Sequence, residues 1–363
     1  MNYLDAIRFR FRMDKYPSHV VLFVTARCNA RCNHCFYWKE IQEAKRETEL
    51  TLDEIEKISK NFRHIKLLSV TGGEPSLRDD LPDIIHIFHK NNGVTNVVFH
   101  TNAFFPKKVK ELVIRILKEN PKIELNLQVS IDGPKELHDE IRKVKNGFKK
   151  VEETIRLITE EKKNFKNLNI TINTCLTYFN QNRIKELIDY CFENFDIDGY
   201  YVSIVRGNAM DPKAKETDIK KYQEVLAHLH SKEIVKSYYN NYPLSSFRRT
   251  IDYLAPEVVI KTIEKKTQIN PCTGGRSVIV ISEEGVVSPC EMLGKKFGSL
   301  RENDYDIKKI LFTNESKDIK QFIKNKGCAC TWECAIMNSI IFNWRAYPSL
   351  LKKWLKLEAI KHF

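Results

Sequence analysis

Short apolar, β-branched runs alternate with longer amphipathic stretches over the first half of the chain. The apolar runs fall at 19–25, 66–71, 95–100, 123–130, 168–175 and 199–205. Amphipathic stretches with helical periodicity lie between them, near 51–63, 80–92, 106–119, 147–164 and 181–195. Thr51, with Glu54 three residues later, forms a capping box that marks the start of the first helix. Six such repeats predict parallel strands, arranged as a barrel or as an open doubly wound sheet.

The residues with the most distinctive chemistry follow the ends of the predicted strands. A cysteine loop follows the first apolar run, and later runs are followed by Gly72-Gly73-Glu74, Thr101-Asn102, Ser130-Ile131-Asp132 and Arg206-Gly207. The carboxyl ends of parallel strands in a barrel lie on one rim, where catalytic groups collect. We therefore expect these segments to converge on one site.

The cysteine loop has the spacing Cys-x3-Cys-x2-Cys, at Cys28, Cys32 and Cys35. Three thiolates at this spacing can hold three irons of a [4Fe–4S] cluster and leave the fourth iron open to a small molecule. Two alternatives remain, a zinc site with His34 as the fourth ligand and a chance group of thiols.

These motifs together resemble the radical S-adenosylmethionine (radical SAM) superfamily. The cysteine loop, the run Thr71-Gly72-Gly73-Glu74-Pro75 and the run Ser130-Ile131-Asp132-Gly133 are similar to that family's motifs, and they extend over roughly residues 19 to 206. The resemblance implies a partial (β/α)6 TIM-like barrel that binds S-adenosylmethionine on the open iron.

The resemblance also implies roles for particular residues. Gly72, Gly73 and Glu74 would contact the methionine moiety, with the Glu74 carboxylate accepting a hydrogen bond from its ammonium group. The other expected cofactor-binding residues are Ser130 and Asp132 at the ribose, Arg142 at the methionine carboxylate, His34 near the adenine, and Asn102, which faces the cavity without an assigned role. Ordinary turn residues at Ser130 and Asp132, and a surface arginine at Arg142, are the alternatives.

A second group of cysteines lies near the C-terminal end. Cys272, Gly285 and Cys290 resemble the opening of the SPASM/Twitch extension found on radical SAM enzymes, and apolar residues 278–281 and 286–287 predict its β-hairpin. A full SPASM domain has seven cysteines, and this segment has five. The resemblance therefore implies one auxiliary [4Fe–4S] cluster, held by Cys272, Cys290, Cys334 and either Cys328 or Cys330. A zinc-binding hairpin is the alternative.

The predicted segments divide the chain into five parts. They are an N-terminal extension (1–18), the core barrel (19–207), a helical bridge that roofs the substrate cavity (208–270), the cluster domain (271–340) and a basic amphipathic tail (341–363). The tail contains Leu351 and Leu355 on one helical face and Lys352 and Lys356 on the other, so it can dock on the barrel or lie on a membrane surface. We favour docking.

The net charge and the cysteine content indicate which partners the protein can bind and which cellular compartment suits it. The formal net charge of +13 suits an acidic electron donor such as a flavodoxin or ferredoxin, or simply a solvated lysine-rich surface. Its even spread does not favour nucleic acid. Eight of the ten cysteines in 363 residues lie in two groups at metal-ligand spacings, which indicates a reduced cytoplasmic setting.

The expected function is a radical SAM oxidoreductase or maturase-type reaction. The enzyme would cleave S-adenosylmethionine reductively to a 5′-deoxyadenosyl radical, which abstracts hydrogen from an unactivated carbon of a peptide or of a small molecule such as a sugar, amino acid or lipid precursor. The auxiliary cluster would aid oxidation or modification of that substrate. A tRNA-modifying radical enzyme and a non-enzymatic iron–sulfur electron carrier are the two alternatives.

Overall fold

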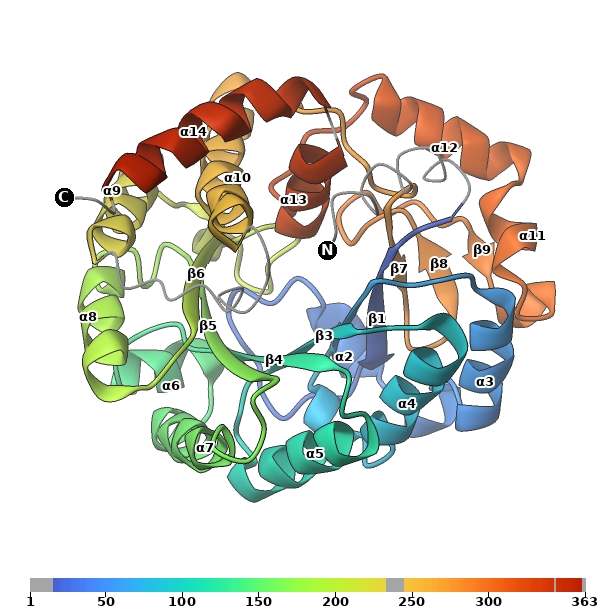
Figure 1. The fold of residues 1–363 in the computed structure, drawn as a ribbon, viewed down its shortest axis with the longest axis horizontal. Helices are drawn as coiled ribbons and strands as arrows, with labels where there is room; N and C mark the ends of the chain where they lie inside the picture. Colours follow the sequence, from blue (N-terminus) through green and yellow to red (C-terminus); the bar gives the residue numbers. More distant parts are fainter. Residues whose placement is uncertain (1–15, 233–244, 343, 361–363) are drawn as a thin grey trace.

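The computed structural model describes residues 16–232, 245–342 and 344–360 of the chain. Parts of the expected N-terminal extension, helical bridge and tail fall outside these ranges. A single nine-stranded sheet runs through the described residues in the order β6-β5-β4-β3-β2-β1-β7-β8-β9. Its ends, β6 and β9, do not pair, so the barrel is open (Figure 1).

Six parallel strands form the barrel, and each bound lies within one residue of its expected position. They are β1 (His19–Thr25), β2 (Leu67–Gly72), β3 (Asn96–Thr101), β4 (Glu124–Ser130), β5 (Leu168–Leu176) and β6 (Gly199–Ile204). All seven residues of β1 are buried, because helices cover one face of the sheet and other parts of the chain fill the other. The expected partial barrel is confirmed.

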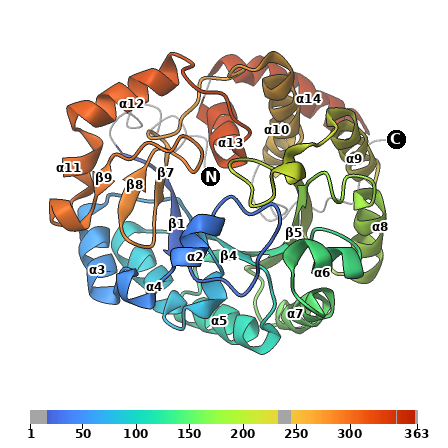
Figure 2. The same ribbon diagram turned by 180° about the vertical axis from the view of Figure 1, so that it is seen from behind.

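Amphipathic helices cover the outer face of these strands (Figure 2). They are α3 (Leu52–Asn61), α4 (Leu81–Asn92), α5 (Pro106–Glu119), α7 (Gly147–Glu161) and α8 (Ile184–Asn194). The Thr51–Glu54 capping box is confirmed, since the Glu54 amide donates to the Thr51 hydroxyl and the Thr51 amide donates to the Glu54 carboxylate. Two short helices that the periodicity did not predict, α2 (Trp38–Glu43) and α6 (Glu136–Arg142), lie at the rim.

The predicted hairpin forms as β7 (Val278–Ile281) and β8 (Val286–Ser288), followed by β9 (Gly298–Ser299). Strand β7 pairs in parallel with β1, so the hairpin extends the barrel sheet rather than forming a sheet of its own. Helices α11 (Ile307–Leu311), α12 (Asn314–Lys324) and α13 (Glu333–Phe342) follow. The second cysteine group is thereby placed directly beside β1.

Two helices of the expected bridge, α9 (Ile219–Ser231) and α10 (Ser245–Lys265), stand with α13 over the inner face of the sheet (Figure 1). The last helix, α14 (Tyr347–Ile360), runs along α10. Leu350 of α14 is buried and the Lys353 ammonium lies 2.6 Å from a Glu257 carboxylate oxygen, as expected for a docked tail. Leu351 and Leu355 remain exposed.

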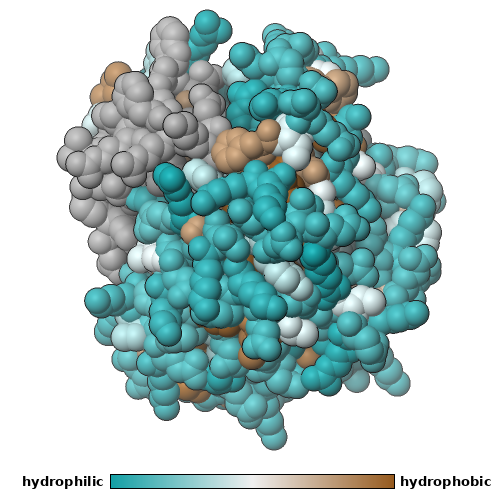
Figure 3. Space-filling view, turned by 90° about the vertical axis from the view of Figure 1, so that its right-hand side faces the viewer, coloured by the Kyte–Doolittle hydropathy of each residue, from teal (hydrophilic) through white to brown (hydrophobic). Residues whose placement is uncertain are grey.

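The outer surface over α11 and α12 is mostly hydrophilic, with small scattered apolar areas (Figure 3). Within the described ranges, no helix combines the length and the apolar character needed to cross a bilayer.

Arg301, from the segment after β9, fastens the hairpin region to the barrel. Its guanidinium donates to both Glu54 carboxylate oxygens at 2.7 and 3.0 Å and to the Glu49 carbonyl at 3.2 Å. These bonds lower the pKa of Glu54 to about 2, although burial acts in the opposite direction. A lowered carboxyl pKa stabilises the fold above the unfolded-state pKa, and the stabilisation is lost as pH falls from about 4.5 to about 2.

We expect Arg301→Ala to lower the free energy of unfolding at neutral pH by about 1 kcal/mol, as for a well-formed ion pair near the surface. The loss should shrink below about pH 4, where Glu54 protonates in the variant. Urea unfolding at several pH values measures both effects. Arg183→Ala, which breaks an exposed pair with Glu186 at the start of α8, is the matched control and should change stability less. Equal losses in the two variants at every pH would contradict the role given to Arg301.

Candidate active site

The cysteine loop lies at the carboxyl end of β1 and is fixed by backbone hydrogen bonds from two distant segments. The Arg31 and Asn33 amides donate to the carbonyls of Arg142 and Ile141, at the end of α6. The Met210 amide, after β6, donates to the Cys35 carbonyl at 2.9 Å. The backbone of the loop is therefore fixed by two segments that lie far from it in the sequence.

The three loop thiols are close enough to influence one another and are shielded from water. Burial, followed by the nearby Cys32 thiol, raises the pKa of both Cys28 and Cys35 to about 12. Such thiols deprotonate when a metal centre offsets the thiolate charge. All ten cysteines of the chain are free of disulfides.

A single-ion site is not assembled here. No three Cys, His, Asp or Glu side chains lie close enough to hold one metal ion within the ranges the structure describes. His34, the proposed fourth zinc ligand, has its Nε2 atom 3.6 Å from an Asp132 carboxylate oxygen.

The two glycines at the end of β2, Gly72 and Gly73, allow close packing within the chain. Gly72 has φ of +124°, and a Cβ atom there would lie 2.2 Å from the Thr25 carbonyl oxygen. A Cβ atom on Gly73 would lie 2.2 Å from the Arg27 carbonyl oxygen. The close approach that we expected toward a ligand is thus made to the start of the cysteine loop, and side chains at either position would push that loop away.

The Glu74 carboxylate is buried and is already hydrogen-bonded by the chain. It accepts from the Ser76 amide at 3.0 Å, the Thr101 hydroxyl at 2.7 Å and the Asn102 amide at 2.7 Å. Burial raises the pKa of Glu74 even though these bonds act against it. These contacts give the carboxylate a structural role that sequence reasoning missed, which is to join the ends of β2 and β3.

Asp132 and Arg142 form a buried ion pair beside the cysteine loop. The Arg142 Nε atom lies 2.6 Å from an Asp132 carboxylate oxygen, and the other oxygen accepts from the Cys175 amide at 2.9 Å. Burial alone would raise the pKa of Asp132, but Arg142 outweighs it and the pKa lies below its ordinary value. Arg142 also contacts Cys32, so the expected ribose and carboxylate ligands lie next to the thiols.

The remaining expected cofactor residues lie on the same rim. Asn102 donates from its side chain to the Asn29 side chain at 2.7 Å, which ties the end of β3 to the cysteine loop. Ser130 ends β4, in register with Asn173 of β5. His34 is largely buried, and burial lowers its pKa to about 4, so its ring is neutral near pH 7.

The second cysteine group lies on the other side of β1. Cys272, Cys290, Cys330 and Cys334 pack against one apolar cluster that contains Phe23, Val280 and Trp332. Cys328 packs against the main core instead, and its sulfur accepts a 3.5 Å hydrogen bond from the Gln268 side chain.

Aromatic residues from the first cysteine loop reach this second group. Phe36 and Tyr37 pack against the same apolar cluster, and the Tyr37 ring lies edge-on to Phe23 with 4.7 Å between centroids. The Tyr37 hydroxyl donates to the Glu283 carboxylate of the hairpin turn at 2.5 Å. The residues that follow the first cysteine loop therefore pack against the same apolar cluster as the second cysteine group.

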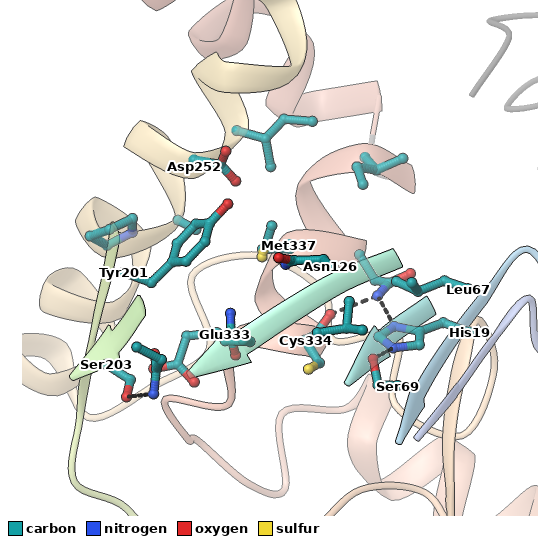
Figure 4. Close-up of a pocket in the computed structure, with 18 of the residues that line it drawn as sticks. His19, Leu67, Ser69, Asn126, Tyr201, Ser203, Asp252, Glu333, Cys334 and Met337 are labelled. Atoms are coloured by element: carbon teal, nitrogen blue, oxygen red, sulfur yellow. Dashed lines mark hydrogen bonds between the residues drawn. The ribbon is translucent and has the colours of Figure 1, made fainter. Parts of the chain in front are cut away.

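A cavity of about 650 Å³ occupies the space between the inner face of the barrel and helices α9, α10 and α13 (Figure 4). The strands contribute polar side chains, including Ser69, Asn126 and Ser203, whereas α9 and α10 contribute mainly apolar ones. Cys334 and Glu333 of α13 also line it. Helices α9 and α10, which belong to the expected bridge, line this cavity.

Sequence reasoning missed the part of this cavity that α13 supplies. Asn338 donates to the Cys334 carbonyl at 2.7 Å and to the His19 Nδ1 atom at 3.2 Å. His19 therefore carries its proton on Nε2 and donates to the Ser69 hydroxyl at 2.9 Å. No local motif marks Asn338, since its partner His19 lies 319 residues away in the chain.

Comparisons with known proteins match this arrangement. Residues 22–191 match the family model described as the radical SAM superfamily. A probable GTP 3′,8-cyclase of Methanococcus vannielii is 28% identical over 230 residues, which cover 61% of this chain and 69% of that protein. The GTP 3′,8-cyclase of Helicobacter pylori is 25% identical over 339 residues, covering 86% and 89%. The Fe-coproporphyrin III synthase of Methanosarcina barkeri is 26% identical over 161 residues, covering 40% and 37%.

Two solved structures have the same fold. Streptococcus suis SuiB bound to S-adenosylmethionine gives a TM-score of 0.58 at 17% identity, covering 88% of this chain and 72% of SuiB. The structure of anSMEcpe with bound AdoMet gives a TM-score of 0.55 at 19% identity, covering 93% and 98%. Residues 22–191 therefore belong to the radical SAM superfamily, and the chain is an enzyme that contains this radical SAM domain.

Proposed function

We propose that the protein is a radical SAM enzyme that modifies a peptide or a small molecule inside the barrel cavity, with the help of an auxiliary [4Fe–4S] cluster. The observation that carries this proposal is the convergence of the Cys28, Cys32 and Cys35 thiols with Asp132 and Arg142 on one rim. A reduced cluster held there would supply the electron that cleaves a carbon–sulfur bond of S-adenosylmethionine, which would give methionine and a 5′-deoxyadenosyl radical able to abstract a hydrogen atom from the substrate.

The residues present fit a cluster with one open iron. Cys28, Cys32 and Cys35 supply three free, shielded thiols on a loop whose backbone is fixed by α6 and by the segment after β6. Arg142 places a positive charge beside Cys32, which favours the thiolate that binds iron.

S-Adenosylmethionine would lie between this loop and the rim residues. We assign its contacts to the backbone of residues 72–74, to Ser130, Asp132 and Arg142, and to His34 and Asn102. Asp132 and Arg142 form a buried ion pair, so each side chain would already hold one orientation when the cofactor binds. Water exclusion is supported by the burial of Glu74 and Asp132 beneath the rim.

Reductive cleavage of the cofactor tests the proposal directly. With dithionite, anaerobically reconstituted protein should convert S-adenosylmethionine to 5′-deoxyadenosine slowly even without substrate, as measured by chromatography and mass spectrometry. Formation of S-adenosylhomocysteine as the only nucleoside product would indicate polar methyl transfer and would refute the radical reaction.

We assign the auxiliary cluster to Cys272, Cys290, Cys330 and Cys334. Their packing against one apolar cluster supports this choice over Cys328, which faces the main core. The group lies beside the cavity, because Cys334 lines it. A cluster in that position suits uptake of an electron from a substrate radical, and therefore net oxidation.

Alanine variants at the two neighbouring cysteines distinguish these assignments. We expect Cys330→Ala to lower the iron content from about eight to about four per chain, because a [4Fe–4S] cluster commonly takes four cysteine ligands. Cys328→Ala is the matched control and should keep about eight. Iron analysis of both reconstituted variants measures the difference, and the opposite pattern would assign the cluster to Cys328. Solubility is checked in parallel, because loss of a ligand can unfold a small metal-binding region.

The relatives suggest two substrate classes. The volume of the cavity suits a small molecule or a single side chain of a bound peptide. SuiB has also been solved bound to a precursor peptide, at a TM-score of 0.59, which makes a peptide worth testing. Sequence relatives named GTP 3′,8-cyclase favour GTP as a second candidate, and one such match covers 86% of this chain. A rise in 5′-deoxyadenosine formation on addition of GTP, with consumption of GTP, would support that candidate.

The cluster would need an electron donor in the cell to reduce it. We propose an acidic flavodoxin or ferredoxin, on the strength of the net charge of +13. A tRNA substrate would also be attracted by the positive net charge. Binding of tRNA that weakens steeply as the salt concentration rises would indicate such a substrate. Cytoplasmic location remains part of this proposal.

A further inference from the structure

The cavity inside the barrel lies apart from the residues that we assign to the cofactor. None of those residues is among the described residues that line it, whereas Cys334 of the second cysteine group is. The cavity is therefore available to a substrate while S-adenosylmethionine occupies the rim. Its volume of about 650 Å³ suits a small molecule.

The strands give this cavity a wall of polar groups that a ligand can reach. His100 of β3, Gln128 of β4 and Asn173 of β5 come from adjacent strands, line the cavity and are only partly buried. His100 is hydrogen-bonded to Gln128, its partner in register, and Asn173 donates to the Ser203 hydroxyl at 3.4 Å. An amide side chain has two donor and two acceptor positions, so Gln128 and Asn173 keep hydrogen-bonding capacity for a ligand.

The helices opposite the strands contribute mainly apolar side chains. They include Leu226 of α9, Ile251 and Val259 of α10, and Met337 and Ile341 of α13. A ligand between the two walls gains most when its hydrogen-bonding groups face the strands and its apolar surface faces the helices.

The cations of the cavity lie toward its two ends. Three of the described lining residues are cationic, namely Lys66, Lys122 and Arg206. Arg206, at the rim, is paired with carboxylate oxygens of Glu333 and Glu291 at 2.8 and 3.2 Å. Lys66 and Lys122 precede β2 and β4, at the end of the strands opposite the rim. Neither end therefore brings a cation to the amide groups of the strand wall.

The histidines of the strand wall are neutral near pH 7. Burial lowers the pKa of His19 to about 3 and that of His100 to about 4. Glu124 and Asp252 add acidic side chains to the lining. An anionic group on this wall would give up its hydration for contacts with amides, hydroxyls and neutral rings, which costs more than the same exchange for an uncharged group.

We propose that the cavity binds an uncharged amphipathic substrate, such as an alkyl glycoside, whose hydroxyl groups lie on Gln128 and Asn173 and whose apolar part lies on the helices. The inference rests on the proposed function, because it takes the ligand of the cavity to be the substrate. It favours a neutral compound over GTP, which carries a triphosphate.

The test compares three probes that differ in one feature each. They are hexyl β-D-glucoside, hexyl β-D-glucuronide, which carries a carboxylate, and methyl β-D-glucoside, which lacks most of the alkyl chain. Equilibrium dialysis against the reconstituted protein with S-adenosylmethionine present should show hexyl glucoside bound about tenfold more tightly than either of the others. GTP should not displace it.

Lysine variants locate the bound probe. Gln128→Lys adds a cation to the strand wall and should shift the preference about tenfold toward the glucuronide. Asn173→Lys repeats the test on the neighbouring strand, in case one variant folds poorly. Gln321→Lys adds the same charge at an exposed position of α12 outside the cavity and should leave the preference unchanged. Iron content and urea unfolding, measured on every sample, show whether each variant is intact.

Wild-type protein that binds no probe, binds the glucuronide or the methyl glucoside as tightly as hexyl glucoside, or releases hexyl glucoside to GTP would overturn the proposal. A preference unchanged in both cavity variants would place the probe elsewhere on the protein and would overturn it as well. Failure of the proposed function looks different, since wild-type protein would then form no 5′-deoxyadenosine, whatever preference dialysis showed.

Discussion

Replacement of Cys28, Cys32 and Cys35 together by alanine is expected to abolish conversion of S-adenosylmethionine to 5′-deoxyadenosine and to leave about half of the iron, that is, about four of eight atoms per chain. The physical reason is that these thiols are the only cysteines on the cysteine loop, whereas the second group lies across β1 on the hairpin and α13. Iron and sulfide analysis, with chromatography of the reaction products, measures both effects.

The matched control is Cys191→Ala, which removes a fully buried thiol of α8 outside both cysteine groups. It should keep all of the iron and the cleavage activity, although the small cavity it leaves will cost some stability. An iron content unaffected by the triple replacement, or zinc in place of iron, would contradict the cluster assignment. Loss of all iron would instead mean that the second cluster cannot assemble without the first.

The strands and main helices could be predicted from the sequence because their signals are local. The side chains of residues 67–72 themselves indicate a strand. The two residues of the capping box, Thr51 and Glu54, lie only three positions apart. The addition of β7 beside β1 could not be predicted in this way. It depends on pairing between His19 and Val278, which are far apart in the chain, and four apolar residues fit either a separate sheet or an extended one.

The same distinction applies to the site. Motifs at the strand ends indicated correctly which segments gather on the rim, because parallel strands bring their carboxyl ends together. The partners of each side chain could not be predicted. The sequence placed Arg206 after a strand but did not predict its ion pair with Glu333, which comes from α13. The backbone hydrogen bonds between the cysteine loop and α6 likewise cannot be predicted from residue types, because almost any residue can supply a backbone amide or carbonyl.

Glu74 shows how such contacts change an expectation. From the motif alone, Glu74→Ala would remove one contact to the cofactor ammonium and weaken its binding by about 1.5–3 kcal/mol. In the structure, the same change leaves the Ser76 amide, the Thr101 hydroxyl and the Asn102 amide without their acceptor. Each buried donor that loses its partner costs about 1–3 kcal/mol, so the structural cost exceeds that of one cofactor contact.

We therefore expect Glu74→Ala to lower the free energy of unfolding by about 3 kcal/mol or more, a large share of the 5–15 kcal/mol typical of a protein. Glu74→Gln is the matched control, because its single carbonyl oxygen can still accept from part of this group, and its loss should be intermediate. Urea unfolding of the reconstituted proteins gives the stability, and equilibrium dialysis gives the affinity for S-adenosylmethionine. If Glu74→Ala unfolded at the wild-type urea concentration while cofactor affinity alone fell, the carboxylate would be a cofactor ligand and its three contacts would contribute little to the fold.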